Sequence, residues 1–232
     1  MNYTNKGLVN HAKMALSLDT VYMWGGILRL VEKQYNTLFK MYGNKNGTGY
    51  TPARWTKLKN LCYKNVYGVD CVGLIKSYLW SGQENGGVGS PNYGIDCPDI
   101  PAGDMYNKAR EKGTVRNLQG VIQIPEIEGL ILYCKTYPHV GIYIGNGKVI
   151  ESTLSARGDG VVKTDIKDFA WEYWFKCPYI SYNEKINKSI EQIAREVIQG
   201  LWGAGDERKR RLTDAGYSYQ KVQDMVNKML KG

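Results

Sequence analysis

The residues best suited to chemistry are a cysteine, a histidine and a glutamate from two different halves of the chain. Cys71 opens an apolar run with helical spacing, so we expect it in the first turn of a helix over residues 71–80. Unpaired N–H groups and the helix dipole favour a thiolate there, and a thiolate is a nucleophile. On this segment alone, a cysteine buried as a small hydrophobe is the better interpretation, so the other segments must decide.

His139 and Glu151 lie in two short strand-like runs joined by Gly145-Asn146-Gly147, which is typical of a hairpin. A three-residue loop would pair Ile144 with Lys148. His139 and Glu151 would then share one face of the sheet, as diagonal neighbours with Cα atoms about 7 to 8 Å apart. A two-residue loop would send them to opposite faces. In the first register a thiol, a base and an orienting group can converge, as nucleophilic catalysis requires.

The periodicity of the remaining segments predicts an α+β fold, with helices in the first half and an antiparallel sheet in the second. Glycine, asparagine and proline predict a long irregular loop over residues 81–103. The expected helices cover residues 5–18, two stretches within 27–67, the Cys71 helix and residues 105–112. The expected strands cover residues 129–134, 139–144, 148–152 and 173–176.

The character of the chain changes after residue 182. We expect a catalytic domain over residues 1–182, a polar linker over 183–188 and a small three-helix module over 189–232. Ser189 opens a capping box for the first of these helices, Asp206 is the expected N-cap of the second, and Ser218 that of the third.

Composition narrows the class of protein. The net charge of +9 predicts an anionic partner, and a cell wall with anionic polymers fits better than nucleic acid, for which no motif is present. Only two histidines occur, His11 is expected to be a packed structural residue, and the five cysteines form no C-x-x-C pair. We therefore expect no metal and no other cofactor. No apolar run reaches the roughly 20 residues of a membrane span, so no membrane insertion is expected.

Three segments in order resemble the NlpC-type papain-like cysteine peptidases that cut bacterial cell-wall peptides. They are Tyr22-Met23-Trp24-Gly25-Gly26, Val69-Asp70-Cys71-Val72-Gly73-Leu74 and His139-Val140-Gly141-Ile142-Tyr143-Ile144-Gly145-Asn146-Gly147. The resemblance covers roughly residues 5–180, and it is weakest in an insert at 27–67 and in the region 81–128. It implies a papain-like domain in which a helix packs on an antiparallel sheet.

The resemblance also implies roles for single residues. Cys71 would attack an amide carbonyl, His139 would act as base and Glu151 would orient the imidazole. Tyr22 would stabilise the oxyanion together with the backbone N–H of Cys71.

Two further residues of these segments are candidates for substrate binding. Asp70 would contact the substrate or the helix start, and Trp24 would contact the substrate. The chain departs from the family twice. Glu151 stands where a histidine is common, and Val72 stands where a serine often helps to hold a free substrate amine.

The tail is similar to the short cell-wall-binding repeats of phage lysozymes and lysins. The likeness rests on residues 194–203, 206–212, 215–217 and 222–223. It implies binding of glycan-peptide units, with Trp202, Arg208 and Arg211 as candidate contacts. Trp202 as a partly buried core residue and the arginines as a solvated face remain the simpler alternatives. A single repeat predicts modest affinity, because avidity is absent.

Together these features indicate a two-module peptidoglycan hydrolase of phage or prophage type. The first 20 residues contain no apolar signal-peptide core, so we expect synthesis in the host cytoplasm and action at the bacterial cell wall. The favoured bond joins γ-D-glutamate to lysine or diaminopimelate, and the alternative bond joins N-acetylmuramate to L-alanine. A papain-like acyltransferase and a non-catalytic wall-binding protein are the other classes. The sequence does not define an oligomeric state.

Overall fold

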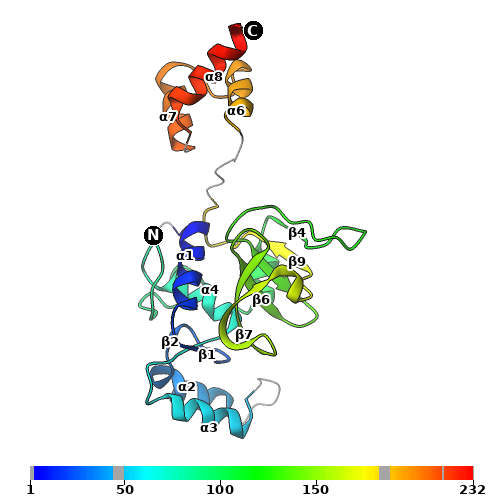
Figure 1. The fold of residues 1–232 in the computed structure, drawn as a ribbon. Coiled ribbons are helices and arrows are strands. Elements are labelled where there is room, and N and C mark those ends of the chain that lie inside the picture. Colours follow the sequence, from blue (N-terminus) through cyan, green and yellow to red (C-terminus); the bar gives the residue numbers. More distant parts are fainter. Residues whose placement is uncertain (1–2, 44–49, 183–188, 216, 232) are drawn as a thin grey trace. The chain divides into compact units, whose positions relative to one another are not determined.

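The protein is described by a computed structural model, which covers residues 3–43, 50–182, 189–215 and 217–231. Two compact units are present, Met1–Tyr182 and Asn183–Gly232 (Figure 1). The expected linker at 183–188 lies outside the described residues.

The first unit begins with helices around a small sheet. The order of this sheet is β1-β3-β2, in which β1 and β3 are parallel and β2 and β3 are antiparallel. Thr4 caps the first helix, and Thr51 caps the third, which has proline at its first position. The elements are α1 (Asn5–Leu16), β1 (Thr20–Tyr22), β2 (Arg29–Leu30), α2 (Val31–Tyr42), α3 (Pro52–Leu61), β3 (Tyr67–Val69), α4 (Cys71–Trp80) and α5 (Ala102–Lys108).

A six-stranded antiparallel sheet forms the second half of this unit, in the order β4-β9-β5-β6-β7-β8. The predicted α+β class is therefore confirmed. The strands are β4 (Lys112–Thr114), β5 (Ile131–Cys134), β6 (His139–Tyr143), β7 (Lys148–Ser155), β8 (Gly158–Asp165) and β9 (Tyr173–Phe175), with a short 3-10 helix at Ile166–Asp168 between the last two.

The β6–β7 hairpin has the predicted three-residue register. Ile142 pairs with Ile150, and the Ile144 N–H donates to the carbonyl of Lys148 at 2.9 Å. The loop residues Gly145, Asn146 and Gly147 have φ values of 85°, 53° and 68°. Glycine and asparagine adopt this left-handed region most readily, so the composition of the loop specifies the register.

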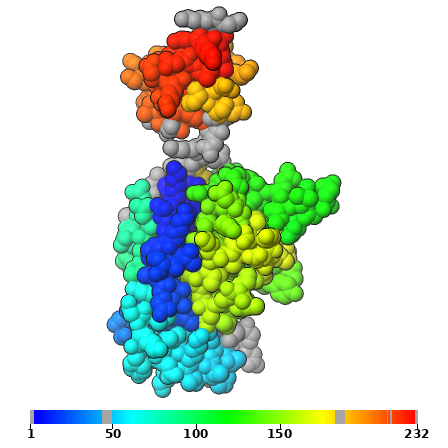
Figure 2. Space-filling view, in the orientation of Figure 1, coloured from blue at the N-terminus to red at the C-terminus, as the bar shows by residue number. Residues whose placement is uncertain are grey.

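Helix α4 is the central helix of the core, and every residue from Val72 to Trp80 is buried. It packs against α1 on one side and against β6 and β7 on another. In Figure 2, α1 (blue) lies at the surface between the strands of the large sheet and the segment that follows α4. The inner face of α1 buries His11, whose Nε2 lies 2.8 Å from Ser77 Oγ, so the predicted structural role of His11 is confirmed.

Several elements differ from the expectations. The short strands β1, β2 and β3 were not expected. The helix expected at 105–112 covers Ala102–Lys108, and β4 begins at Lys112. Strand β8 was not expected, because Gly158 and Gly160 interrupt its apolar alternation. Both glycines adopt positive φ, and Gly160 packs against the backbone of Thr20.

The second unit contains three helices, α6 (Ile190–Ile198), α7 (Gly205–Asp214) and α8 (Tyr219–Lys231). The capping box of Ser189 with Gln192 is confirmed, and Ser218 Oγ accepts from the N–H of Lys221 at 3.4 Å. The predicted N-cap at Asp206 is wrong. The observed N-cap is Ala204, two residues earlier, and Asp206 lies in the first turn, where an acidic side chain still interacts favourably with the helix dipole. The core of this unit is Ile193, Ala194, Val197, Leu212, Val222 and Val226.

Across the described ranges, no helix is both long enough and apolar enough to span a bilayer.

Gly73 generates a prediction for the core. A Cβ placed there would lie 2.0 Å from the carbonyl oxygen of Gly26. Alanine normally stabilises a helix interior relative to glycine, but here the clash should dominate. We expect Gly73→Ala to lower the free energy of unfolding by about 2 kcal/mol or more in urea titrations. Unchanged or increased stability would contradict the close packing of α4 on the Tyr22–Gly26 segment.

Candidate active site

Cys71 lies at the first position of α4, and Asp70 fixes that position. One carboxylate oxygen of Asp70 accepts from the Gly73 N–H at 2.5 Å, which caps the helix. The other accepts from the Gly25 N–H at 2.7 Å and so ties the Tyr22–Gly26 segment to the helix start. Of the two roles considered for Asp70, this geometry supports contact with the helix start.

The protonation of Cys71 differs from the expectation. Burial, followed by the nearby carboxylate of Asp70, raises the pKa of the half-buried thiol to about 12. The N–H groups of Val140, Val72 and Cys71 itself oppose this rise without reversing it. The pKa is not lowered as expected, because burial of the sulfur, together with the negative charge of Asp70 beside it, outweighs the N–H groups of the helix start. Cys71 therefore needs a base to become a nucleophile.

The nearest element that carries such a base is β6. The backbone N–H of Val140, the residue after His139, lies close enough to the Cys71 sulfur to lower the pKa of the thiol. Strand β7 is joined to the start of α4 as well, because Ser152 Oγ donates to the carbonyl of Val69 at 2.7 Å. These two contacts place the N-terminus of α4 against the ends of the strands that carry His139 and Glu151.

His139 and Glu151 form a direct pair, with 2.6 Å between His139 Nε2 and Glu151 Oε2. The carboxylate accepts at Nε2, so the other ring nitrogen, Nδ1, is left for proton exchange. The His139 ring is also held from the side. It stacks on Trp171 with 5.5 Å between ring centroids and meets the edge of Phe169 at 5.4 Å.

Glu151 is fully buried and is satisfied by three side chains. Besides His139, Arg157 donates from Nη2 at 3.0 Å and from Nε at 3.2 Å, and Thr164 Oγ1 donates at 2.8 Å. Burial alone would raise the pKa of Glu151, but these hydrogen bonds, led by that of His139, lower it to about 2. Glu151 is therefore an anion at neutral pH.

Four of these supporting residues were missed by the sequence analysis. Arg157 and Thr164 belong to the turn and second strand of the β7–β8 hairpin, and Phe169 and Trp171 follow it. The signal that could have found Thr164 is the run Val161-Val162-Lys163-Thr164, read as a partner strand of 148–155. The sequence carries no comparable signal for Arg157, because its position depends on the hairpin turn.

Tyr22 is held at the site by its backbone. The Asp159 carboxylate accepts from the Tyr22 N–H at 3.0 Å, and the Arg54 guanidinium donates to the Tyr22 carbonyl. Arg54 and Asp159 are themselves an ion pair between α3 and β8. Burial and the proximity of Cys71 raise the pKa of Tyr22, so its hydroxyl stays protonated and can donate a hydrogen bond.

A cleft of about 540 Å³ opens beside Cys71. Tyr22, Trp24 and Asp70 line it, and so does Pro138, the neighbour of His139. The cleft is within the size range of small-molecule sites. Tyr22, Trp24, Asp70 and Cys71 therefore line one cleft, in which Trp24 is 39% exposed. His139 and Glu151 pair with each other on β6 and β7, the strands that contact α4.

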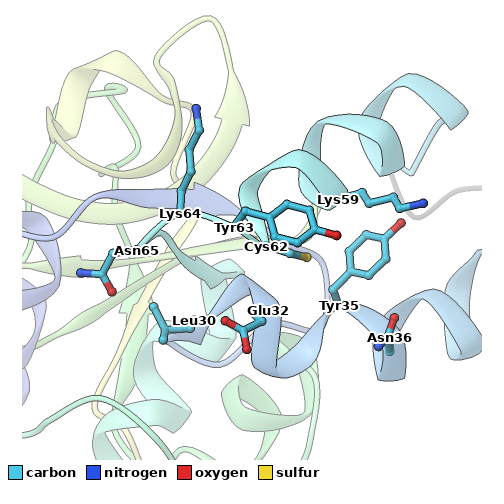
Figure 3. Close-up of a pocket in the computed structure, with 9 residues that line it drawn as sticks. All are labelled: Leu30, Glu32, Tyr35, Asn36, Lys59, Cys62, Tyr63, Lys64 and Asn65. Atoms are coloured by element: carbon cyan, nitrogen blue, oxygen red, sulfur yellow. The ribbon is translucent and has the colours of Figure 1, made fainter.

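A larger hollow of about 650 Å³ contains none of these candidates (Figure 3). It lies beside α2 and the segment that follows α3. Its lining residues are Leu30, Glu32, Tyr35, Asn36, Lys59, Cys62, Tyr63, Lys64 and Asn65.

Among the residues that the structure describes, no group of three or more histidine, cysteine, aspartate or glutamate side chains could hold a metal ion.

In the second unit, the three candidates surround the turn between α6 and α7. Trp202 is half-buried, and its Nε1 donates to Glu196 at 3.0 Å. Arg208 donates to the carbonyl of Gly203 at 3.0 Å, and Arg211 to that of Leu201 at 3.2 Å while lying 5.9 Å from the Trp202 ring. All three therefore stabilise this turn, whatever else they bind.

The buried carboxylate of Glu151 predicts a pH dependence of stability. A carboxyl group with a pKa of about 2 when folded and an ordinary value of 4.5 stabilises the protein above pH 4.5. This contribution is lost as the pH falls toward 2. We expect Glu151 to account for about 2 kcal/mol of the decrease in unfolding free energy between pH 7 and pH 3.

Urea titrations at the two pH values measure this decrease, and Glu151→Gln should show it reduced by that amount. Asp159→Asn is a comparison variant that should also reduce the decrease, because Asp159 has a pKa lowered to about 2 without contacting His139. An unchanged pH dependence in Glu151→Gln would contradict the buried anion.

The comparisons with known proteins concern the tail. Residues 191–230 match the CW_7 repeat family. The chain is 56% identical over 47 residues to a protein named "Lysozyme" from Streptococcus phage Cp-7. That stretch is 20% of this chain, and the chain spans only 14% of the length of that protein. The predicted resemblance of the C-terminal residues to a repeat of phage lysozymes is thereby confirmed, and residues 191–230 carry a CW_7 repeat.

Proposed function

We propose that this chain is a phage-type cell-wall hydrolase in which residues 1–182 form a papain-like cysteine amidohydrolase. The observation that carries the proposal is the pair formed by the buried Glu151 and His139, on a strand whose next residue, Val140, lies close to the sulfur of Cys71 at the start of α4. A nucleophile, a base and an orienting group are the minimum set for acyl transfer.

In the proposed reaction, His139 removes the proton from the Cys71 thiol as the sulfur attacks the carbonyl carbon of a peptide amide. The backbone N–H of Cys71 and the Tyr22 hydroxyl donate to the developing oxyanion. When the C–N bond breaks, His139 returns the proton to the leaving amine and a thioester remains on Cys71. Water, deprotonated by His139, then hydrolyses the thioester.

The raised pKa of Cys71 supports proton transfer to His139 during attack rather than a resting thiolate. Glu151 and Tyr22 suit their roles because one is kept anionic and the other neutral. The anion favours the imidazolium that forms during attack, and the neutral phenol can donate a hydrogen bond.

The proposed substrate is the stem peptide of bacterial peptidoglycan. Two observations support it, the resemblance of the three segments to cell-wall peptidases and the CW_7 repeat in the tail. The relative's printed name, lysozyme, concerns a protein of which this chain covers a small part, so it supports action at the cell wall without identifying the bond. The favoured bond is γ-D-glutamyl to lysine or diaminopimelate, and the alternative is N-acetylmuramoyl to L-alanine.

The second unit, residues 183–232, is proposed to hold the enzyme on the wall. Its contribution is to raise the local concentration of the catalytic unit at the substrate. With one CW_7 repeat matched, the expected affinity is modest.

Removal of the nucleophile tests the proposed chemistry. Cys71→Ala should lower the rate of turbidity loss of purified cell walls to the uncatalysed background, a decrease of at least about a thousandfold. Wall binding in a pelleting assay should not change. Cys62→Ala is the matched control, because Cys62 is also a half-buried free cysteine but lies outside the cleft. Lysis that persists in Cys71→Ala would refute the cysteine mechanism.

Removal of the tail tests the division of labour. A chain without residues 183–232 should bind walls at least tenfold more weakly and lyse them more slowly, since it loses local concentration. On soluble muropeptides its kcat/KM should stay within about twofold of the full chain. A truncated protein that is folded by circular dichroism but inactive on soluble muropeptides would contradict the separation.

A further inference from the structure

The 27–67 insert forms one wall of the cleft at Cys71. Helix α2 presents Lys33, Thr37 and Met41 to the cleft, at the i, i+4, i+8 spacing that places side chains on one helical face. Leu38 and Tyr42 of the same helix complete this wall, and Arg29 extends it from β2. This insert, one of the two regions where the resemblance is weakest, therefore lies where a substrate would be recognised.

The acidic and basic side chains that line this cleft differ in whether they have partners within the protein. Both acidic residues on its wall already have hydrogen-bond or ion-pair partners within the protein. Asp70 accepts from two backbone N–H groups, and Asp99 accepts from Lys76 and from Tyr93. Lys76 is consequently paired as well. No acidic residue of the wall is left to balance a further cation.

Two cations of the insert remain. Within the described part of the chain, the ion-pair partner of Lys33 is the exposed Glu32, at 3.3 Å, and such a pair has little energetic consequence. Arg29 has no ion-pair or side-chain hydrogen-bond partner among the described residues of the chain. A guanidinium on the wall of a cleft, with its N–H groups not engaged by other side chains, is suited to bind a carboxylate through two parallel hydrogen bonds.

We propose that Arg29 binds a substrate carboxylate and that the insert thereby selects stem peptides with a free α-carboxylate on the D-glutamyl residue. This inference rests on the proposed function. In a γ-D-glutamyl amide the scissile carbonyl and the α-carboxylate belong to the same residue, so this carboxylate is the one nearest to Cys71. The apolar residues Leu38, Met41 and Ile100 would face the aliphatic part of the peptide.

The test uses the full chain and two synthetic N-acetylmuramoyl tetrapeptides of the sequence L-Ala-γ-D-Glu-L-Lys-D-Ala. One carries a free α-carboxylate on D-glutamate and the other carries its amide. Wild-type protein should show a lower KM for the free carboxylate. Arg29→Gln should raise that KM at least tenfold, the size expected for one charge-assisted contact, and change the KM of the amide less than twofold.

Arg29→Lys should recover part of the effect, since it keeps the charge and loses the fork. Arg110→Gln is the matched control, an exposed arginine outside the cleft, and should change neither KM. Thermal melting establishes that each variant is folded. Equal KM changes for both peptides in Arg29→Gln, or none, would overturn the role of Arg29 while leaving the proposed function intact. Failure of folded wild-type protein to cleave either peptide would overturn both.

Discussion

The candidate site is organised around one buried carboxylate, that of Glu151, and the hydrogen bonds that it requires. Glu151 has no contact with solvent, so an unpaired charge there would be strongly destabilising. The fold supplies three donors from different places, His139 on β6, Arg157 in the β7–β8 turn and Thr164 on β8. Each donor requires the hairpins to be in register. The orientation of the imidazole is therefore a consequence of how the sheet buries this charge.

A second constraint joins the sheet to the cysteine. Asp70 connects the start of α4 to the Tyr22–Gly26 segment through its two oxygens, and Ser152 joins β7 to Val69. The Arg54–Asp159 ion pair between α3 and β8 then holds the backbone of Tyr22. The insert is thus part of the support of the site as well as a wall of the cleft. Its contribution explains how a segment in which the resemblance is weak can be compatible with the same arrangement of functional groups.

The sequence alone predicted the elements whose residue types strongly favour one local structure. Turn chemistry predicted a hairpin at Gly145-Asn146-Gly147 and left two registers open. The structure has left-handed backbone at all three residues and the register that places His139 and Glu151 on one face. The start of α4 at Cys71 followed from the periodicity of the apolar run. Arg157 and the strand β8 did not follow, because glycines mask the alternation and because the role of Arg157 depends on a turn that brings it back over Glu151.

The pKa of Cys71 was misjudged for a related reason. The helix start favours a thiolate at Cys71, but burial of the sulfur and, after it, the carboxylate of the Asp70 cap raise the pKa instead. Likewise, Asp206 lies inside α7 although its residue type favours an N-cap, since the chain enters that helix through Gly205. In both cases the residue's place in the sequence favoured one result, and its surroundings in the fold produced another.

The central claim is that the Cys71–His139–Glu151 set cleaves an amide of the stem peptide. Mass spectrometry of purified peptidoglycan digested by the wild-type chain, with Cys71→Ala as control, tests it most directly. The account predicts new fragments that end in D-glutamate or D-isoglutamine and begin with a free amine on lysine or diaminopimelate, absent from the control. Cleavage only between sugars, or fragments equally present with Cys71→Ala, would contradict it.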